Sequence, residues 1–548
     1  MHRPNPFPDL LVAALTSYWN TCYMWSPFIH RSTFLSALNS PTPCPIYRRS
    51  PLALYYAVAS LGLSESGLNG ITDFDRIRWG KYCSDRAKEE LQTEYFARAT
   101  EDPGRMTPLE AIQATLCILP YNVAGGNVPG GLALMGQVQD ALMELCFDSE
   151  GAWKPVGEGV QAWIEDEMRV RTFLSFFQGD VTFAYYLKRN PWVDYRAVVF
   201  RMPCHERFFD AGDAGEAYEK MRGEAVERLR GVKGGPVAFN LGQLLDGEEE
   251  ERARVLQELV HGVFDGHVST VAISVVATAL RVARIELRSL REAAGIDVYR
   301  LAARITPEMM APGLFAATPG TTDAEAEYLR RTQVVEQVLV NFLSFLPEGV
   351  GSALTEGDVV PLFSSGERYF GEKNCACTVL VALCAMHSAR LQNWIDDDLV
   401  VTAEFATDTS AGSPYSFLSS PCFLSVLDSG VVFIRLLSSH MRYDPELKGV
   451  HMGFLMGILN AGALSLAGWK ISSQKSPGQN IREQYAEDVA VVNRYLERMG
   501  SRFRPYGGFS LRVIVRGTDT EVAGEQFATI FQKLVTAAGI ERIPRGTE

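Results

Sequence analysis

The apolar residues of this chain recur mostly at intervals of three and four positions, which is the spacing of helices that bury one face. Only residues 509–515 alternate in the manner of a strand, and one strand cannot form a sheet. The pattern therefore predicts an all-α protein, a large multi-helix domain built of antiparallel helical hairpins without a significant sheet. The predicted helices cover residues 52–63, 79–95, 165–187, 216–229, 256–294, 379–394, 423–440, 451–469 and 482–498.

The clearest helix boundary lies at Thr107. This residue is expected to cap a helix, because a proline and then a glutamate follow it at the positions that each prefers in a first turn. Pro120 and the glycine-rich residues 124–131 are expected to end this helix in a loop. A second helix is predicted from Leu132 onward, so the two helices form an antiparallel hairpin.

Composition and charge exclude several classes of protein. With 47% hydrophobic and 21% charged residues, the chain of 548 residues is expected to be globular and to form more than one helical bundle or one large helical domain. Its formal net charge is -13, and an acidic surface repels phosphate. Direct DNA binding by this chain is therefore not expected. Residues 454–469 are the most apolar stretch, but they are too short and too polar to span a membrane.

The ten cysteines contain no C-x2-C pair, so no metal site is predicted and the thiols are expected to stay reduced inside the cell. The run of glutamates at 248–251 is expected to be a solvated helix start or a loop. Four arginines at helical spacing near the end of the predicted helix 256–294 suggest a basic face. Because Glu286 and Glu292 are interleaved with them, we instead expect an exposed helix face with salt bridges. These arginines are Arg281, Arg284, Arg288 and Arg291.

No motif of a hydrolase nucleophile, a phosphate loop, a dinucleotide-binding turn or a zinc protease occurs, and no cofactor is expected. The chain is instead rich in aromatic residues, with 29 Phe, 20 Tyr and 8 Trp. Most of them are explained by core packing. A helical domain of this kind can also enclose an apolar pocket, for which Tyr185, Tyr186, His387 and Trp394 are candidate lining residues.

Six stretches in a fixed order resemble the regulatory ("middle homology") domain of fungal zinc-cluster transcription factors. They are residues 27–35 (PFIHRSTFL), 50–59, 109–116, 131–136, 167–173 and 201–206. The resemblance implies that residues 1–230 form the core of this domain. Residues 231–548 are then a further helical part of the same domain, with loops near 314–323 and 405–421.

The resemblance also implies structural roles for four motif residues, His30, Arg31, Arg169 and Arg171. The chain departs from the family at the last motif, where an arginine-rich signature that ends in tryptophan is reduced to two arginines and Phe173. In the family, a six-cysteine zinc cluster normally precedes this domain. The cysteines of this chain cannot supply such a cluster, so a protein without its own DNA-binding module is expected.

Three functions follow from these observations. The first is a transcription-regulator-like protein, a co-regulator or a ligand-sensing and partner-binding protein of a fungal secondary-metabolism pathway, in the nucleus. The second is a cofactor-free cyclase of cycloaddition type, which would act on a natural product in an apolar pocket of the same fold, in the cytoplasm. The third is a purely structural interaction module. The expected partners are a hydrophobic small molecule, another protein or a second copy of the chain, so enzyme and regulator both stay open.

Overall fold

The computed structural model describes the greater part of the N-terminal half of the chain and separate helical segments beyond it. Apart from a few single positions and two short strands, it describes residues 8–23, 27–39, 51–64, 71–100, 105–124, 127–145, 159–201, 238–261, 270–305, 320–346, 421–443 and 487–496. Several predicted elements lie largely or wholly outside the described residues. They are the helix at 216–229 except Glu219, the helix at 379–394, most of the helix at 451–469, and the loop at 405–421 except Pro421.

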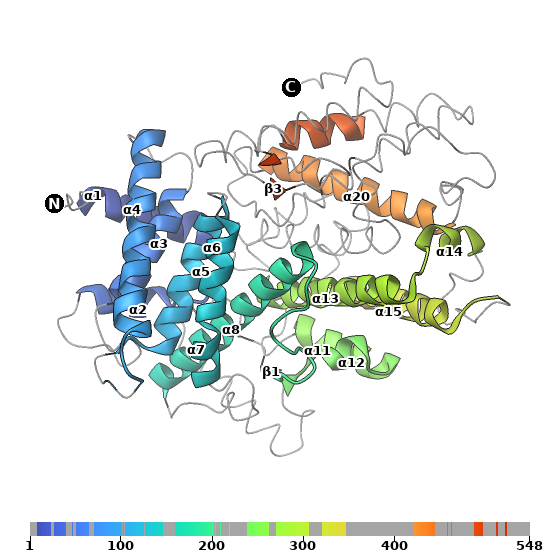
Figure 1. Ribbon diagram of the computed structural model, residues 1–548, viewed down its shortest axis with the longest axis horizontal. Helices are drawn as coiled ribbons and strands as arrows, with labels where there is room; N and C mark the ends of the chain where they lie inside the picture. Colours follow the sequence, from blue (N-terminus) through green and yellow to red (C-terminus); the bar gives the residue numbers. More distant parts are fainter. Residues whose placement is uncertain are drawn as a thin grey trace.

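An N-terminal helical bundle occupies the left of Figure 1, in blue to teal. Helix α3 contacts α1, α4 and α5, and α5 also contacts α6, α7 and α8. Its α-helices, with two short π-helices η1 and η3, are α1 (Pro8–Ser17), η1 (Tyr18–Cys22), α2 (Arg31–Asn39), α3 (Leu52–Ser64), α4 (Asp73–Leu91), η3 (Gln92–Phe96), α5 (Pro108–Ala124), α6 (Val128–Gln137), α7 (Gln139–Glu144) and α8 (Val160–Tyr186).

A second group of helices follows in the sequence, and α8 connects the two groups because it packs against both α5 and α13. Helices α13 and α15 lie side by side, and α11 and α12 cover them on one side (Figure 1). Helix α14 contacts α20. The bounds are α11 (Leu241–Leu245), α12 (Glu249–His261), α13 (Thr270–Ala294), α14 (Val298–Arg304), α15 (Asp323–Phe345) and α20 (Pro421–Tyr443), and residues 487–496 are also helical.

Strands are confined to two short antiparallel pairs in the part of the chain that the structure describes. Strand β1 (Phe200–Arg201) pairs with β2 (Ala238–Phe239), and β3 (Leu511–Arg512) pairs with β4 (Glu521–Val522). These two-residue strands make no layer of their own, so the prediction of an all-α fold is confirmed. Among the helices that are described, none is long and apolar enough to cross a bilayer.

Helix α5 confirms the predicted start and corrects the predicted end. Thr107 Oγ1 accepts a hydrogen bond from the Glu110 N–H at 3.2 Å. However, α5 continues through Pro120 to Ala124. The loop expected around 124–131 is also shorter, since Asn127 caps α6 and glycines 130 and 131 are helical. A proline removes one backbone donor from a helix, and here the packing of α5 against its neighbours outweighs that loss.

Helix α13 corrects the prediction of an exposed arginine face. Arg284 and Arg288 are 1% and 3% exposed, because this helix packs against α8, α11, α12 and α15. Arg288 donates to the backbone oxygen of Tyr185 at 3.0 Å, and Arg281 donates to Thr182 Oγ1 at 3.2 Å. These bonds fix the C-terminal end of α8 against α13. The glutamates at 249–251 do begin a helix, as predicted.

Two helix backbones approach each other closely where α1 crosses α3. Gly62 of α3 faces Ala14, and a Cβ atom at position 62 would lie 1.9 Å from the Ala14 carbonyl oxygen. Only a residue without a side chain fits at such a distance. Next to this crossing, Leu11, Leu63 and Trp79 belong to a small apolar cluster between α1, α3 and α4.

Candidate functional site

The motif at 27–35 lies over a buried polar centre that α5 and α8 supply. Gln113 of α5, which is fully buried, donates to the Phe28 backbone oxygen at 2.9 Å and to Thr172 Oγ1 at 3.0 Å. Its own side-chain oxygen accepts from the Tyr47 hydroxyl at 3.0 Å. Buried polar groups are tolerated only where they are hydrogen-bonded, so Gln113 fixes the position of the motif relative to α5 and α8.

Arg171 of α8 makes the second connection to the same segment. It is 1% exposed, and it donates to the Pro27 backbone oxygen at 3.2 Å. Its Nε lies 3.4 Å from the Glu167 carboxylate one turn earlier, and its guanidinium lies 4.3 Å from the centre of the Phe209 ring. The buried cation thus has a carboxylate, a carbonyl and an aromatic face around it. We call Pro27, Phe28, His30, Gln113 and Arg171 the motif centre.

His30 completes the motif centre. Its Nδ1 lies 2.7 Å from Thr33 Oγ1 and accepts the Thr33 backbone N–H at 3.4 Å, while its ring packs 5.2 Å from that of Phe209. Burial lowers the pKa of His30 to about 4, a hydrogen bond with the Phe209 backbone opposes this, and the positive charge of Arg171 adds to it. The imidazole is therefore neutral at physiological pH.

This neutral imidazole makes the stability of the protein depend on pH. In the unfolded chain the pKa of His30 is 6.5, whereas in the folded protein it is about 4. The unfolded state therefore binds more protons between these values, and the free energy of unfolding falls as the pH falls from 6.5 toward 4. We expect His30 to contribute about 3 kcal/mol to this loss. Urea unfolding of the wild type and of His30→Gln, near neutral pH and near pH 4, measures the contribution. An equal loss in both proteins would contradict it.

The other two motif arginines lie apart from the motif centre. Arg31 is exposed at the start of α2, and its guanidinium lies over the Trp19 ring at 5.5 Å from the ring centre. Arg169 of α8 donates to the Leu145 backbone oxygen at 2.9 Å and thereby connects α8 to the end of α7. The structure thus brings His30 and Arg171 together and places Arg31 and Arg169 at separate helix contacts.

The proposed pocket lining is only partly described. Tyr185 is 9% exposed at the end of α8, where the Arg288 guanidinium lies 5.9 Å from its ring centre. The Tyr186 side chain, His387 and Trp394 lie outside the described residues. The pocket therefore stays a prediction. In the described part of the chain, no three metal-ligating side chains gather at one point.

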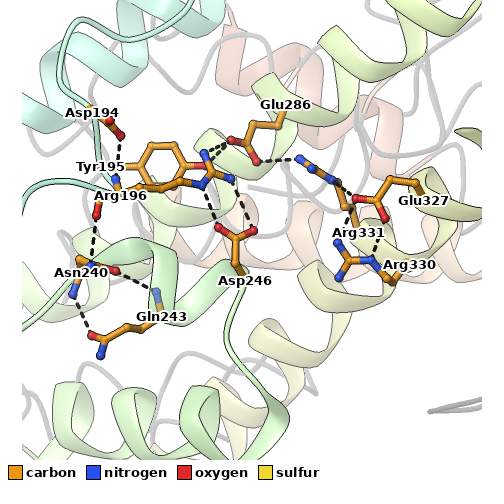
Figure 2. Close-up of polar contacts among 10 residues, drawn as sticks. All are labelled: Asp194, Tyr195, Arg196, Asn240, Gln243, Asp246, Glu286, Glu327, Arg330 and Arg331. Carbon is orange, nitrogen blue, oxygen red and sulfur yellow. Dashed lines mark hydrogen bonds and ion pairs between the residues drawn. The ribbon is translucent and has the colours of Figure 1, made fainter.

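A network of six charged side chains, shown in Figure 2, joins the segment after α8 to three helices. Arg196 Nε lies 2.8 Å from Asp246 at the end of α11, and Arg196 Nη1 lies 2.6 Å from Glu286 of α13. Arg331 of α15 continues the network, since its Nη1 lies 3.1 Å from Glu286. Its Nε lies 2.7 Å from Glu327 of the same helix, which also pairs with Arg330 at 2.8 Å.

Neighbouring contacts fix this charge network to its elements. The Tyr195 hydroxyl donates to Glu286, and the Asn240 side chain donates to the Arg196 backbone oxygen at 3.2 Å (Figure 2). Asn240 also caps α11 together with Gln243. Three cations and three anions alternate along the network, so it carries no net charge. Such an arrangement positions helices, because each of its carboxylates pairs with at least one arginine.

Sequence patterns missed both Gln113 and the charge network. The sequence offers one indication of the role of Gln113, which is a polar residue within an otherwise apolar helix face. No local signal existed for the ion pairs of Arg196, because it contacts Asp246 across 50 positions and Glu286 across 90. The pairs of Glu327 with Arg330 and Arg331 are local, at three and four positions.

One comparison with known proteins bears on the stretch that contains the motifs. Residues 15–228 match the family model described as the fungal specific transcription factor domain. The comparisons with curated proteins and with solved structures give no significant match. The matched range includes the motif centre and ends between β1 and β2, before α11 begins. Over residues 15–228, the resemblance stated from the motifs is thereby confirmed, because this stretch matches the fungal specific transcription factor domain.

Proposed function

We propose that this protein is a nuclear co-regulator of transcription which acts by binding a protein partner or a hydrophobic ligand, and which does not contact DNA itself. The family match over residues 15–228 carries the proposal. The acidic balance of the chain supports the second part. The net charge is -13 and the sequence contains no basic tract, so the overall field of the chain repels phosphates.

The charges that are described also favour partner binding over DNA binding. Many of the arginines of the second helical group are engaged within the protein. Arg284 and Arg288 are buried, and Arg196, Arg330 and Arg331 pair with carboxylates. Cations that are paired in the fold release few counterions from DNA, so they add little to affinity for it.

A tethering experiment tests the regulatory role. The full chain is fused to a heterologous DNA-binding domain and expressed in a fungal host with a reporter gene that carries the matching binding sites. We expect reporter expression to change about fivefold or more on tethering, because local concentration on the promoter replaces the missing DNA contact. The unfused chain is the control and is expected to leave the reporter unchanged. An unchanged reporter with the fusion present at normal levels would contradict the proposal.

Direct DNA contact is tested separately with the purified full chain and a labelled duplex of mixed sequence. At physiological salt we expect no complex at concentrations up to about 10 μM, since nonspecific binders reach Kd values of about 1–100 μM through phosphate contacts. A complex whose affinity falls steeply with salt would remove the second part of the proposal and leave the first. Turnover of an apolar polyene by the same preparation would instead favour the cyclase alternative.

A further inference from the structure

The segment between α8 and the charge network is held at both of its ends, and we call residues 188–196 the strap. At its start Lys188 adopts φ 51, a left-handed conformation that glycine usually supplies. Lys188 N–H donates to the Tyr185 oxygen at 3.4 Å, and Arg189 N–H donates to the Ala184 oxygen at 3.0 Å. This pair of bonds closes the end of α8 and turns the chain sharply into the strap.

Asp180 of α8 fixes the middle of the strap. Its fully buried carboxylate accepts the Trp192 N–H at 2.6 Å and the Val193 N–H at 3.0 Å, and it pairs with Arg189 at 2.8 Å. The Arg189 guanidinium also stacks 4.0 Å from the centre of the Trp192 ring. One carboxylate thus ties three strap residues to the last turns of α8, so strap and helix end form one unit.

The far end of the strap is Arg196, which belongs to the charge network. From there the contacts lead out of the family-matched range, to Asp246 of α11, Glu286 of α13 and Arg331 of α15. The β1–β2 pair lies next to the same junction, because β2 ends one residue before the α11 cap Asn240. Hydrogen bonds therefore connect α8 to the strap, and ion pairs connect the strap through Glu286 to Arg331 of α15.

From these contacts we infer that the strap couples the position of α8 to α11 and α15, and that the charge network makes this coupling sensitive to salt. The inference goes beyond the proposed function and does not rest on it. A rearrangement of α8, which carries Arg171 of the motif centre, would displace Arg196 and with it both helices. Bonds at the two ends of a short rigid segment transmit a displacement, whereas a free loop would absorb it.

Salt sensitivity follows from exposure. The side chains of Arg196 and Asp246 are 41% and 45% exposed, so ions of the solvent screen their attraction. Asp180, by contrast, is fully buried, and its contacts with the strap are screened much less. Bonds to Arg330, followed by those to Arg331, lower the pKa of Glu327 to about 2, which keeps this carboxylate charged at neutral pH. High salt should thus release the far end of the strap and leave its start in place.

Hydrogen–deuterium exchange of the purified full chain tests the coupling. We compare the wild type with Glu286→Gln in the charge network, Asp180→Asn in the middle of the strap, and the double variant. Asp85→Asn is the matched control, because it removes an exposed ion pair with Lys81 on α4. Both single variants are expected to lower protection of α11 and the first turns of α15 by about tenfold, with α3 and α5 unchanged. The control is expected to leave all four helices unchanged.

The double variant distinguishes coupling from two local effects. If the strap couples the elements, the double variant loses no more protection at α11 and α15 than either single one, because each already releases the same segment. Multiplied losses would overturn the inference, as would an Asp180→Asn effect confined to α8 or an equal loss in α3 and α5. Should a variant not fold, the wild type in about 0.1 M and about 1 M salt gives the same readout. Protection of α11 and α15 that is independent of salt would overturn it too.

Discussion

Replacing Arg171 with methionine is expected to lower the free energy of unfolding by about 3–5 kcal/mol, since a buried charge pair then loses one partner. Arg171 holds the Pro27 carbonyl and the Glu167 carboxylate in a region from which water is excluded. Methionine keeps much of the side-chain volume, so the expected loss reports on the polar contacts more than on a cavity. The helical bundle should loosen first where the motif at 27–35 meets α8.

The measurement is urea unfolding followed by far-ultraviolet circular dichroism at neutral pH. Lys81→Met is the matched control, because Lys81 is 71% exposed and makes one ion pair along α4. Its expected effect is below about 0.5 kcal/mol. Equal effects of the two methionine variants would show that the motif centre adds nothing to stability.

The second large effect is expected at the crossing of α1 and α3. In Gly62→Ala the new methyl group would lie 1.9 Å from the Ala14 carbonyl oxygen and 3.1 Å from the Tyr18 backbone nitrogen. Both atoms belong to backbone, so α1 and η1 must move away from α3. We expect a loss of about 2–3 kcal/mol in the free energy of unfolding, because overpacking outweighs the higher helix propensity of alanine.

Gly136→Ala provides the opposite result in the same protein. Position 136 lies in α6, and no atom comes within 4 Å of a Cβ placed there. Alanine is therefore expected to stabilise by up to about 1 kcal/mol. Thermal unfolding of the two variants beside the wild type shows the difference in sign. Stabilisation by both substitutions would mean that α1 does not cross α3 at this distance.

Local signals in the sequence predicted helices well where they coincide with tertiary packing. The start of α5 is an example, since Thr107 and Glu110 make the capping bond that their spacing indicates. Pro120 and the glycines at 130 and 131 predicted a loop, and this was wrong. Local propensity weighs against helix at those positions, but α5 is held along its length by contacts with α3, α6 and α8, which sequence spacing does not reveal.

Periodicity placed the arginines of α13 on one helical surface but could not show what covers it. Arg284 and Arg288 are buried, since α8 packs against this helix from a position about one hundred residues earlier. Glu286 pairs with Arg196 and Arg331 and not with the arginines beside it in sequence. Sequence also could not show which motif residues lie together in the fold. His30 and Arg171 lie close together because the segment before α2 packs on α8 and both side chains contact Phe209. Their separation along the chain gives no indication of this contact.

The antiparallel pairing of β1 with β2 has a practical consequence for protein engineering. Residues 201 and 238 are register partners, so the two ends of the segment between them lie side by side. Sequence inserted between these two residues would lengthen a segment whose two ends are already joined, and for a flexible segment each doubling of the length costs only about 0.6 kcal/mol. An affinity tag or a fluorescent reporter could therefore be introduced there while both helical groups keep their connection.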